Sequence, residues 1–250
     1  MKNLSLFSKA ILFACVLFII SCDNMTVSTG DGSEKVEGSG KLGSEVREIS
    51  TFDQIKIEGV FNVFLSQKDK ESIRVEADEN ILPLVLTSVE NNVLTVKLKD
   101  NTSISKMKKI NVYISMVNIS SLKSEGVGML NCENQLNLNS LELNLSGVGA
   151  SRLNLEVGTL TIKSELVGAL FLTGTAKDVT VKHNGIGAFE AFDLKAEKLN
   201  IETDGVGKAE VFASSELIIE ANGVGGVKYK GNPKTKNIKS EGVGSVESVE

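Results

Sequence analysis

The sequence predicts an all-β fold, a right-handed parallel β-helix (a solenoid) whose N-terminal end is capped by further β structure. A Gly-Val-Gly triplet or a close variant occurs seven times between residues 126 and 244, at steps of 18 to 21 residues. On both sides of each triplet aliphatic and polar residues alternate, which is the period of a strand. A repeat of about 19 residues cannot bury its apolar face alone, so the copies must stack with equivalent strands paired in parallel, and such crossovers are right-handed.

Residues 1–21 are predicted to be a lipoprotein signal peptide. Lys2 and Lys9 form a positive segment, and the apolar stretch over residues 10–20 is too short to cross a bilayer. The stretch ends in Ile-Ile-Ser-Cys at Cys22, which resembles the bacterial lipobox, where the signal is cut before the cysteine and its thiol is acylated. The alternative is an uncleaved anchor helix, although no stop-transfer pattern follows. We therefore expect a lipid anchor at Cys22 in the cell envelope, at the outer membrane, with the side of that membrane left open.

Residues 22–47 are predicted to be the acylated cysteine and a flexible tether, because Gly and Ser are frequent and large apolar residues are few. Cys15 is lost with the signal and Cys22 is lipidated, so Cys132 has no partner for an intramolecular disulfide. The chain carries a net charge of −5 and has no Trp, which excludes a nucleic-acid partner.

Residues 48–118 also alternate and are predicted to be a β region that caps the N-terminal end of the helix. Residues 55–63 have a degenerate strand–Gly–strand pattern, and Asn91-Asn92 between two strand patterns predicts a hairpin turn. A cap is needed because an uncovered terminal strand is an open edge.

Residues 119–250 hold the repeats. The second glycine of the triplet is present in all seven copies, whereas the first is replaced once, by Leu166. Glycine at a corner allows a positive φ or close approach of the neighbouring repeat. We expect the aliphatic residue between the two glycines to plug a corner of the core. The seven structural corner glycines are Gly128, Gly149, Gly168, Gly187, Gly207, Gly225 and Gly244.

The position two residues before the central aliphatic residue alternates between charged and neutral side chains. Its members are Glu125, Ser146, Glu165, Asn184, Asp204, Asn222 and Glu241. Spacing the charges in this way avoids like-charge contacts in an exposed ladder. A cation site is the alternative, but the spacing differs from that of calcium-binding nonapeptide repeats.

No residue is predicted to be catalytic, and neither a metal nor a cofactor is expected. His183, the only histidine, falls in an inward column of small residues, which favours a packed, hydrogen-bonded core side chain. It has no second His or paired Cys for a metal site. Cys132 lies in another inward column, as a small core residue rather than a nucleophile.

Phe171, Phe192 and Phe212 form the candidate binding patch. They lie on adjacent repeats, and strict alternation directs all three outward. Neighbouring exposed phenylalanines would form an apolar surface for a protein or glycan partner. The alternative is that a bend turns some of them inward or that another segment covers them.

Several stretches together resemble the putative auto-transporter adhesin, head GIN domain family of Bacteroidetes envelope proteins. They are the lipobox at Cys22, the Gly-rich tether, and the segments FDQIKIEGVFNVFL (52–65), EADENIL (76–82) and NVLTVKL (92–98), followed by the tandem repeats. The resemblance covers residues 48–250. It implies a right-handed β-helix and an adhesin-like role, and it brings no catalytic or binding residues with it.

We therefore expect a non-enzymatic envelope lipoprotein, bound to the membrane through its lipid, that presents a surface for adhesion or for protein or glycan binding. A structural or self-assembling envelope scaffold is the alternative. Lys234, Lys236, Lys239 and Pro233 in the last repeat oppose edge-to-edge pairing and so disfavour it. A polysaccharide-acting enzyme is the least favoured class, because such uniform repeats leave no room for the long loops that would wall a cleft.

Overall fold

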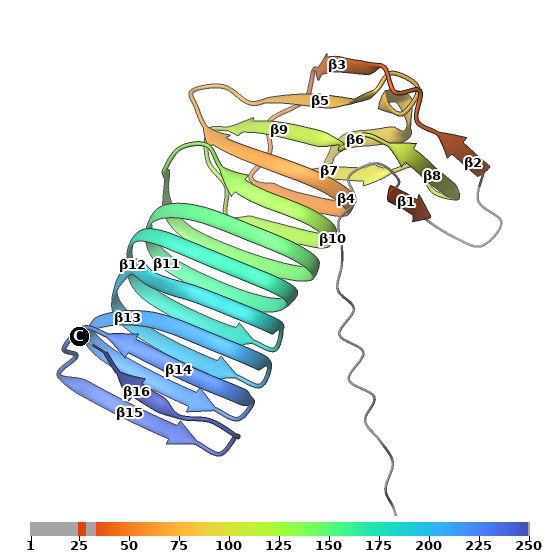
Figure 1. Ribbon diagram of the computed structural model, residues 1–250. Coiled ribbons are helices and arrows are strands. Elements are labelled where there is room, and N and C mark those ends of the chain that lie inside the picture. The colour runs from red at the N-terminus through yellow and green to blue at the C-terminus, as the bar shows by residue number, and fades with distance from the viewer. Residues whose placement is uncertain (1–24, 29–33, 250) are drawn as a thin grey trace, which may run out of the picture.

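The computed structural model describes residues 25–28 and 34–249, and over them the fold is all-β, as predicted (Figure 1). The one helix in this part of the chain is a single 3-10 turn, η1 (Leu82–Leu84). The strands are β1 (Met25–Ser28), β2 (Glu34–Glu37), β3 (Leu42–Arg47), β4 (Gln54–Gln67), β5 (Ser72–Asp78), β6 (Val85–Glu90), β7 (Val93–Leu98), β8 (Thr102–Met107), β9 (Asn111–Met116), β10 (Ser121–Cys132), β11 (Leu136–His183), β12 (Ile186–Thr203), β13 (Val206–Ala221), β14 (Val224–Lys230), β15 (Thr235–Ser240) and β16 (Val246–Ser248).

The strands form a small sheet, in the order β1-β8-β2, and a large mixed sheet of 13 strands. In the large sheet, β5 pairs antiparallel with β3 on one side and with β9 on the other, and β6 and β7 form an antiparallel hairpin. The remaining pairings are parallel, from β9 on β4 through to the C-terminal strands. The sheet as a whole is therefore not purely parallel, because the N-terminal region adds strands by short antiparallel connections.

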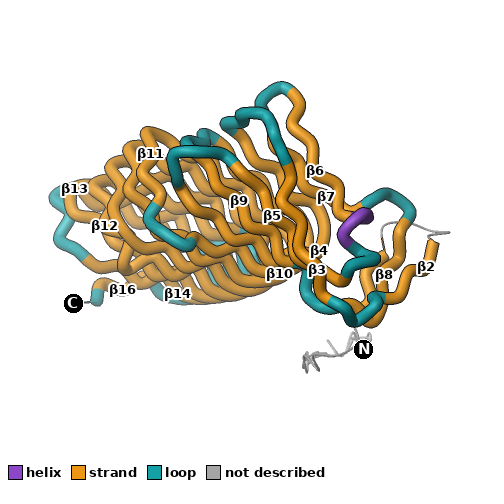
Figure 2. The backbone as a smooth tube through the Cα atoms, turned by 90° about the horizontal axis from the view of Figure 1, so that it is seen from above, coloured by secondary structure: helices purple, strands orange, loops and turns teal. Residues whose placement is uncertain are grey.

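In the repeats the pairing joins equivalent positions of successive copies. Gly126 pairs with Gly147, and Gly187 pairs with Gly207, with the flanking residues in the same register. Figures 1 and 2 show the chain returning turn after turn, so that the strands lie one behind another. Each outward or inward position of one repeat is thus stacked on the same position of the next.

Strand β4 belongs to this stack although it lies in the region predicted as the cap. Gly59 pairs with Gly126 and Val60 with Val127, so residues 55–63 do supply one more copy of the strand–Gly–strand pattern. Figure 1 shows β4 followed by β10 and then by the repeats, with β3, β5, β6 and β7 at the far end. The stack of repeats and the N-terminal region therefore share strand β4, and the predicted boundary at residue 118 does not separate them.

The prediction of a flexible tether over residues 22–47 is wrong for its second half. Strand β3 pairs antiparallel with β5 from Leu42 opposite Asp78 to Arg47 opposite Ile73, and β2 pairs with β8. These strands are largely exposed, and backbone pairing at a sheet edge holds them together with a few side-chain contacts, namely the packing of Val36 on the core and the hydrogen bonds that Arg47 donates to the Leu82 and Val85 carbonyl oxygens. Cys22 and the signal peptide lie outside the described residues.

The core runs through the stack as columns of buried aliphatic side chains. Five residues before the central aliphatic residue, the side chains are buried in six successive repeats. They are Leu122, Leu143, Ile162, Val181, Ile201 and Ile219. Ile162, Val181 and Ile201 therefore share one face, as the alternation predicts, and the same face continues into β4 at Ile55.

Candidate functional site

The corner glycines all adopt a positive φ at the second position of the triplet. Gly187 has φ = +134°, and the other six lie between +138° and +158°. A Cβ at Gly187 would overlap the backbone carbonyl oxygen of Gly168 in the preceding repeat. The first glycine of the same triplet, Gly185, is not among the positive-φ residues, although a Cβ there would also meet a backbone oxygen, that of Leu166. The second position therefore combines two separate demands for glycine in all seven repeats, whereas the first position does so only in the first two, at Gly126 and Gly147.

The central aliphatic residue of each triplet points to solvent, so the prediction that it plugs the core is wrong. The exposed fraction of these side chains runs from 44% at Val127 to 73% at Val243. Alternation continues through the corner: both glycines take inward positions, and the residue between them faces out. We call these residues the aliphatic column, and they are Val127, Val148, Val167, Ile186, Val206, Val224 and Val243.

Apolar side chains border the aliphatic column on its C-terminal side in the first four repeats. Met129, Ala150, Ala169 and Ala188 occupy the outward position two residues later and are half-buried. With neighbouring repeats about 4.8 Å apart, the six steps of the column span roughly 29 Å. The outer surface of the stack therefore carries a narrow apolar strip along most of its length.

The three candidate phenylalanines are half-buried rather than freely exposed, and a cation lies over each ring. The Arg152 guanidinium is 4.7 Å from the centre of the Phe171 ring. The Lys195 ammonium is 4.6 Å from the Phe212 ring, and the Lys230 ammonium is 5.0 Å from the Phe192 ring. The three rings thus take outward positions of the same stack, and each remains partly exposed with one cation over it. We call these six residues the aromatic–cation row.

Successive turns of the stack supply the row. Arg152 and Phe171 come from β11, Phe192 and Lys195 from β12, Phe212 from β13 and Lys230 from β14. Phe212 and Lys230 are register partners in adjacent strands. The Lys195 ammonium also donates a hydrogen bond to the Phe192 carbonyl oxygen at 2.6 Å, which holds it beside the rings. Column alignment could have found Arg152, since it occupies the position of Phe171 one repeat earlier.

The charge ladder before the corner is engaged in ion pairs. Lys123 lies 2.8 Å from Glu125, and Lys163 lies 3.0 Å from Glu165. The hydrogen bond that the Lys123 ammonium donates to the Glu125 carboxylate raises the pKa of Lys123. Within residues 25–28 and 34–249, no three His, Cys, Asp or Glu side chains gather where they could hold a metal ion. Two of the four acids in the ladder, Glu125 and Glu165, are therefore paired with lysines two residues before them in the same strand.

His183 is buried, and its ring centre lies 5.7 Å from that of Phe189. Its Nδ1 has no hydrogen-bond partner in the described part of the chain, so the predicted hydrogen bond is not observed there. The Ser164 hydroxyl of the preceding repeat is buried without a partner in the same way. Burial lowers the pKa of His183, which keeps the ring neutral at pH 7.

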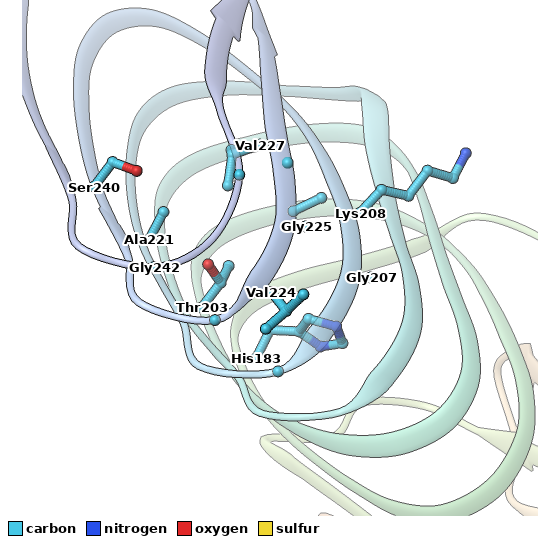
Figure 3. A pocket seen from close by; sticks show the side chains of 15 residues that line it. His183, Thr203, Gly207, Lys208, Ala221, Val224, Gly225, Val227, Ser240 and Gly242 are labelled. Carbon is cyan, nitrogen blue, oxygen red and sulfur yellow. The ribbon is translucent and has the colours of Figure 1, made fainter. Parts of the chain in front are cut away.

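The His183 ring borders a small cavity of about 20 Å³ inside the corner, enough for about one water molecule. Figure 3 shows Thr203, Ala221 and Ser240, which occupy the same inward position in the following repeats, along this cavity. The space is left because the side chains at this position are small and the next two inward positions along the chain, on the corner side, are glycines. A cavity of this size cannot admit a substrate.

Two other reactive side chains are structural. Cys132 is half-buried against the core, and burial raises the pKa of its thiol to about 11, so the nucleophilic thiolate is scarce at neutral pH. Asp78, which the sequence did not single out, is fully buried, and its Oδ2 accepts a hydrogen bond from the backbone N–H of Lys108 at 3.0 Å. Neither side chain faces a cleft.

Comparison with known proteins gives a consistent assignment. The model of the putative auto-transporter adhesin, head GIN domain family matches residues 51–233. A putative adhesin from Bacteroides fragilis has a similar structure, with a TM-score of 0.81 and 26% identity, over 86% of this chain and all of that one. A putative adhesin from Parabacteroides merdae (TM-score 0.67, 22% identity) aligns with 87% of this chain and all of its own. A putative lipid binding protein from Parabacteroides distasonis (TM-score 0.64, 22% identity) aligns with 86% of this chain and all of its own.

The search of curated proteins gives no match. Among the residues that the structure describes, none belongs to a helix long and apolar enough to cross a bilayer.

Proposed function

Because this chain belongs to the putative auto-transporter adhesin, head GIN domain family, we propose that it is a non-enzymatic envelope lipoprotein whose outer surface binds a protein or glycan partner. The aromatic–cation row carries this proposal. Rings that stay half-exposed beside charged groups combine apolar contact area with polar specificity, which is the composition of binding surfaces.

The parallel registers support a right-handed parallel β-helix as the scaffold. A chain that returns to the same sheet through parallel strands crosses over in the right-handed sense. Such a rod repeats its outward positions at every turn, so side chains from distant parts of the sequence form straight lines. The aromatic–cation row draws on two neighbouring columns: Phe212 is stacked on Lys230 in one, while Phe171 is stacked on Glu190 in the other, two residues nearer the corner.

A lipid on Cys22 would hold this rod at the outer membrane. The support is the lipobox ending at Cys22 and the family to which the chain belongs. Anchoring places many copies on one surface, so that weak individual contacts add up to firm adhesion.

Adherence of whole cells tests the proposal. Cells that produce the full chain, its Cys22→Ser variant or no chain are labelled with a fatty acid and scored on immobilised glycans and proteins. We expect the native chain alone to be labelled and to support adherence. Replacing Phe171, Phe192 and Phe212 together with Ser should remove adherence while the β-sheet circular dichroism signal is retained. Labelled, surface-exposed native chain that adheres no better than the empty strain would overturn the proposal.

A further inference from the structure

We propose that the aromatic–cation row is a binding site for an anionic polysaccharide. This inference rests on the proposed function and names its ligand class. It follows from three properties of the row: its free positive charge, its ordered rings and its alignment across successive repeats.

The cations of the row differ from several ion-paired lysines of the stack. Lys56, Lys123 and Lys163 each lie within 3.0 Å of a carboxylate oxygen. In contrast, Arg152 and Lys230 form no ion pair with any described residue, and their charges lie over phenyl rings.

Lys195 has one carboxylate nearby, that of Asp193 at 3.7 Å, whose side chain is 80% exposed. The other acids beside the row, Glu190 and Glu210, contact Lys208 at 2.8 and 3.5 Å. On a chain of net charge −5, this row is therefore a local positive site with unused capacity for an anion.

The rings favour a sugar over a simple ion. Pyranose rings present C–H groups that pack on aromatic faces, while their carboxylates accept charge-assisted hydrogen bonds from ammonium and guanidinium groups. Half-burial fixes the three phenyl rings, so little side-chain entropy is lost when a ligand binds. Each ring of the row has a cation within 5.0 Å, so a sugar that packs on a ring has a charged group next to it.

The backbone under the row argues against an added peptide strand. Strand addition requires an unpaired sheet edge, whereas β12 and β13 are each paired in parallel on both sides. Recognition must therefore use side chains alone. Since these side chains follow one another across β11 to β14, they fit a linear polymer lying along the stack.

Binding of polygalacturonate to the purified full chain, measured by biolayer interferometry, tests the inference. The test variant combines Arg152→Gln, Lys195→Gln and Lys230→Gln. The matched control combines Lys123→Gln, Lys163→Gln and Lys182→Gln, which removes the same charge from ion-paired positions of the same stack. We expect about a tenfold or larger loss of affinity in the test variant, equivalent to about 1.4 kcal/mol or more, and less than a threefold change in the control.

The methyl-esterified polymer has the same backbone without the charges, and the native chain should bind it at least tenfold more weakly. An equal loss of affinity in the test and control variants would show that binding depends only on the net charge of the protein, and it would overturn the inference. Polyglutamate bound as tightly as polygalacturonate would assign the row to acidic proteins instead. If polygalacturonate does not bind while native cells still adhere through the three phenylalanines, the ligand class is wrong and the proposed function stands. Loss of both would remove the proposed function as well.

Discussion

The N-terminal region and the repeats both use backbone with positive φ, but they place different residues there. All four non-glycine residues with positive φ in the described chain, Asn91, Asn92, Asn101 and Lys106, precede the repeats. Within residues 119–249, only glycines adopt positive φ. The same backbone requirement is thus met by two sets of residues in the two halves of the molecule.

Stacking explains the difference. A Cβ built on Gly40, in the N-terminal region, meets no atom within 4 Å, although φ there is +73°. At each of the seven corner glycines, which are the second glycines of the triplets, a Cβ would overlap a backbone oxygen of the preceding repeat or of β4. Asparagine can occupy the left-handed region in an open turn. Between stacked turns no side chain of any kind fits, so the repeats require glycine for space as well as for φ.

The largest expected effect is that of Gly187→Ala. The substitution adds a strained φ and a clash with the Gly168 carbonyl, so we expect the free energy of unfolding to fall by roughly 3 kcal/mol or more. Gly40→Ala bears the φ cost alone and should lose about 1 kcal/mol. Urea denaturation followed by circular dichroism measures both, and equal losses would show that stacking adds nothing.

Gly185→Ala tests the steric demand for glycine separately from the demand for a positive φ, within one triplet. A Cβ at Gly185 meets the Leu166 carbonyl, but φ is not positive there, so Gly187→Ala should cost about 1 kcal/mol more. The same urea experiment decides, and a Gly185→Ala loss as large as that of Gly187→Ala would contradict the two-demand account.

The next largest effect compares substitutions on the buried and the exposed face of one strand in the repeats. Ile201 and Ile186 both belong to β12, but Ile201 is fully buried and Ile186 is 55% exposed. Ile201→Thr places a hydroxyl in the core, which should lower the free energy of unfolding by about 2 kcal/mol. Ile186→Thr keeps the β-branch in solvent and should change it by less than about 0.5 kcal/mol. A large loss at Ile186 would restore the corner-plug interpretation.

The sequence predicts the structure of the repeats better than that of the N-terminal region, because each positional pattern occurs seven times in the repeats. Alternation alone places Ile162, Val181 and Ile201 together in the core. It also implies that the central residue faces out, but the apolar character of Val148 and its equivalents favours burial. In the structure the alternation continues through the corner: the glycines on either side take the inward positions, so the central residue faces out although it is apolar.

The N-terminal region and the site both depend on contacts that a single sequence does not display. Strand β3 is held by backbone pairing to β5, which leaves no pattern in its polar side chains. The three phenylalanines could be placed outward from alternation. Arg152 and Lys230 follow the same columns, but Lys195 could not be placed, since it lies in an irregular stretch where the register of β12 shifts.

A smaller effect tests the N-terminal side of the comparison. Asn91 and Asn92 have φ of 51° and 64° in the hairpin between β6 and β7, so the predicted turn is confirmed. Asn92→Ala should lower the free energy of unfolding by about 1 kcal/mol, because alanine resists the left-handed region. Asn92→Gly should be close to neutral. Thermal melts of the two variants give the difference, and equal melting temperatures would mean that φ strain is unimportant in this turn.

The smallest effect concerns the buried titratable group of each region. Asp78 has a backbone N–H for one oxygen, whereas His183 has no described partner for Nδ1. Because burial lowers the pKa of His183 in the folded chain, the unfolded chain takes up the proton first, near pH 6.5. The free energy of unfolding should therefore fall as the pH drops below about 6.5, and level off once the folded protein is protonated too.

The variant His183→Leu isolates this contribution, since Leu145 occupies the equivalent inward position two repeats earlier and is buried. His183 is the only histidine, so no other imidazole contributes between pH 7.5 and 5. Urea unfolding at a series of pH values should give a difference curve, native minus variant, that declines through this range. A flat curve would mean that the folded protein accepts the proton as readily as the unfolded chain. The cavity beside His183 would then be wet enough to solvate the imidazolium, and the repeats would be more open to water at this corner than their close stacking indicates.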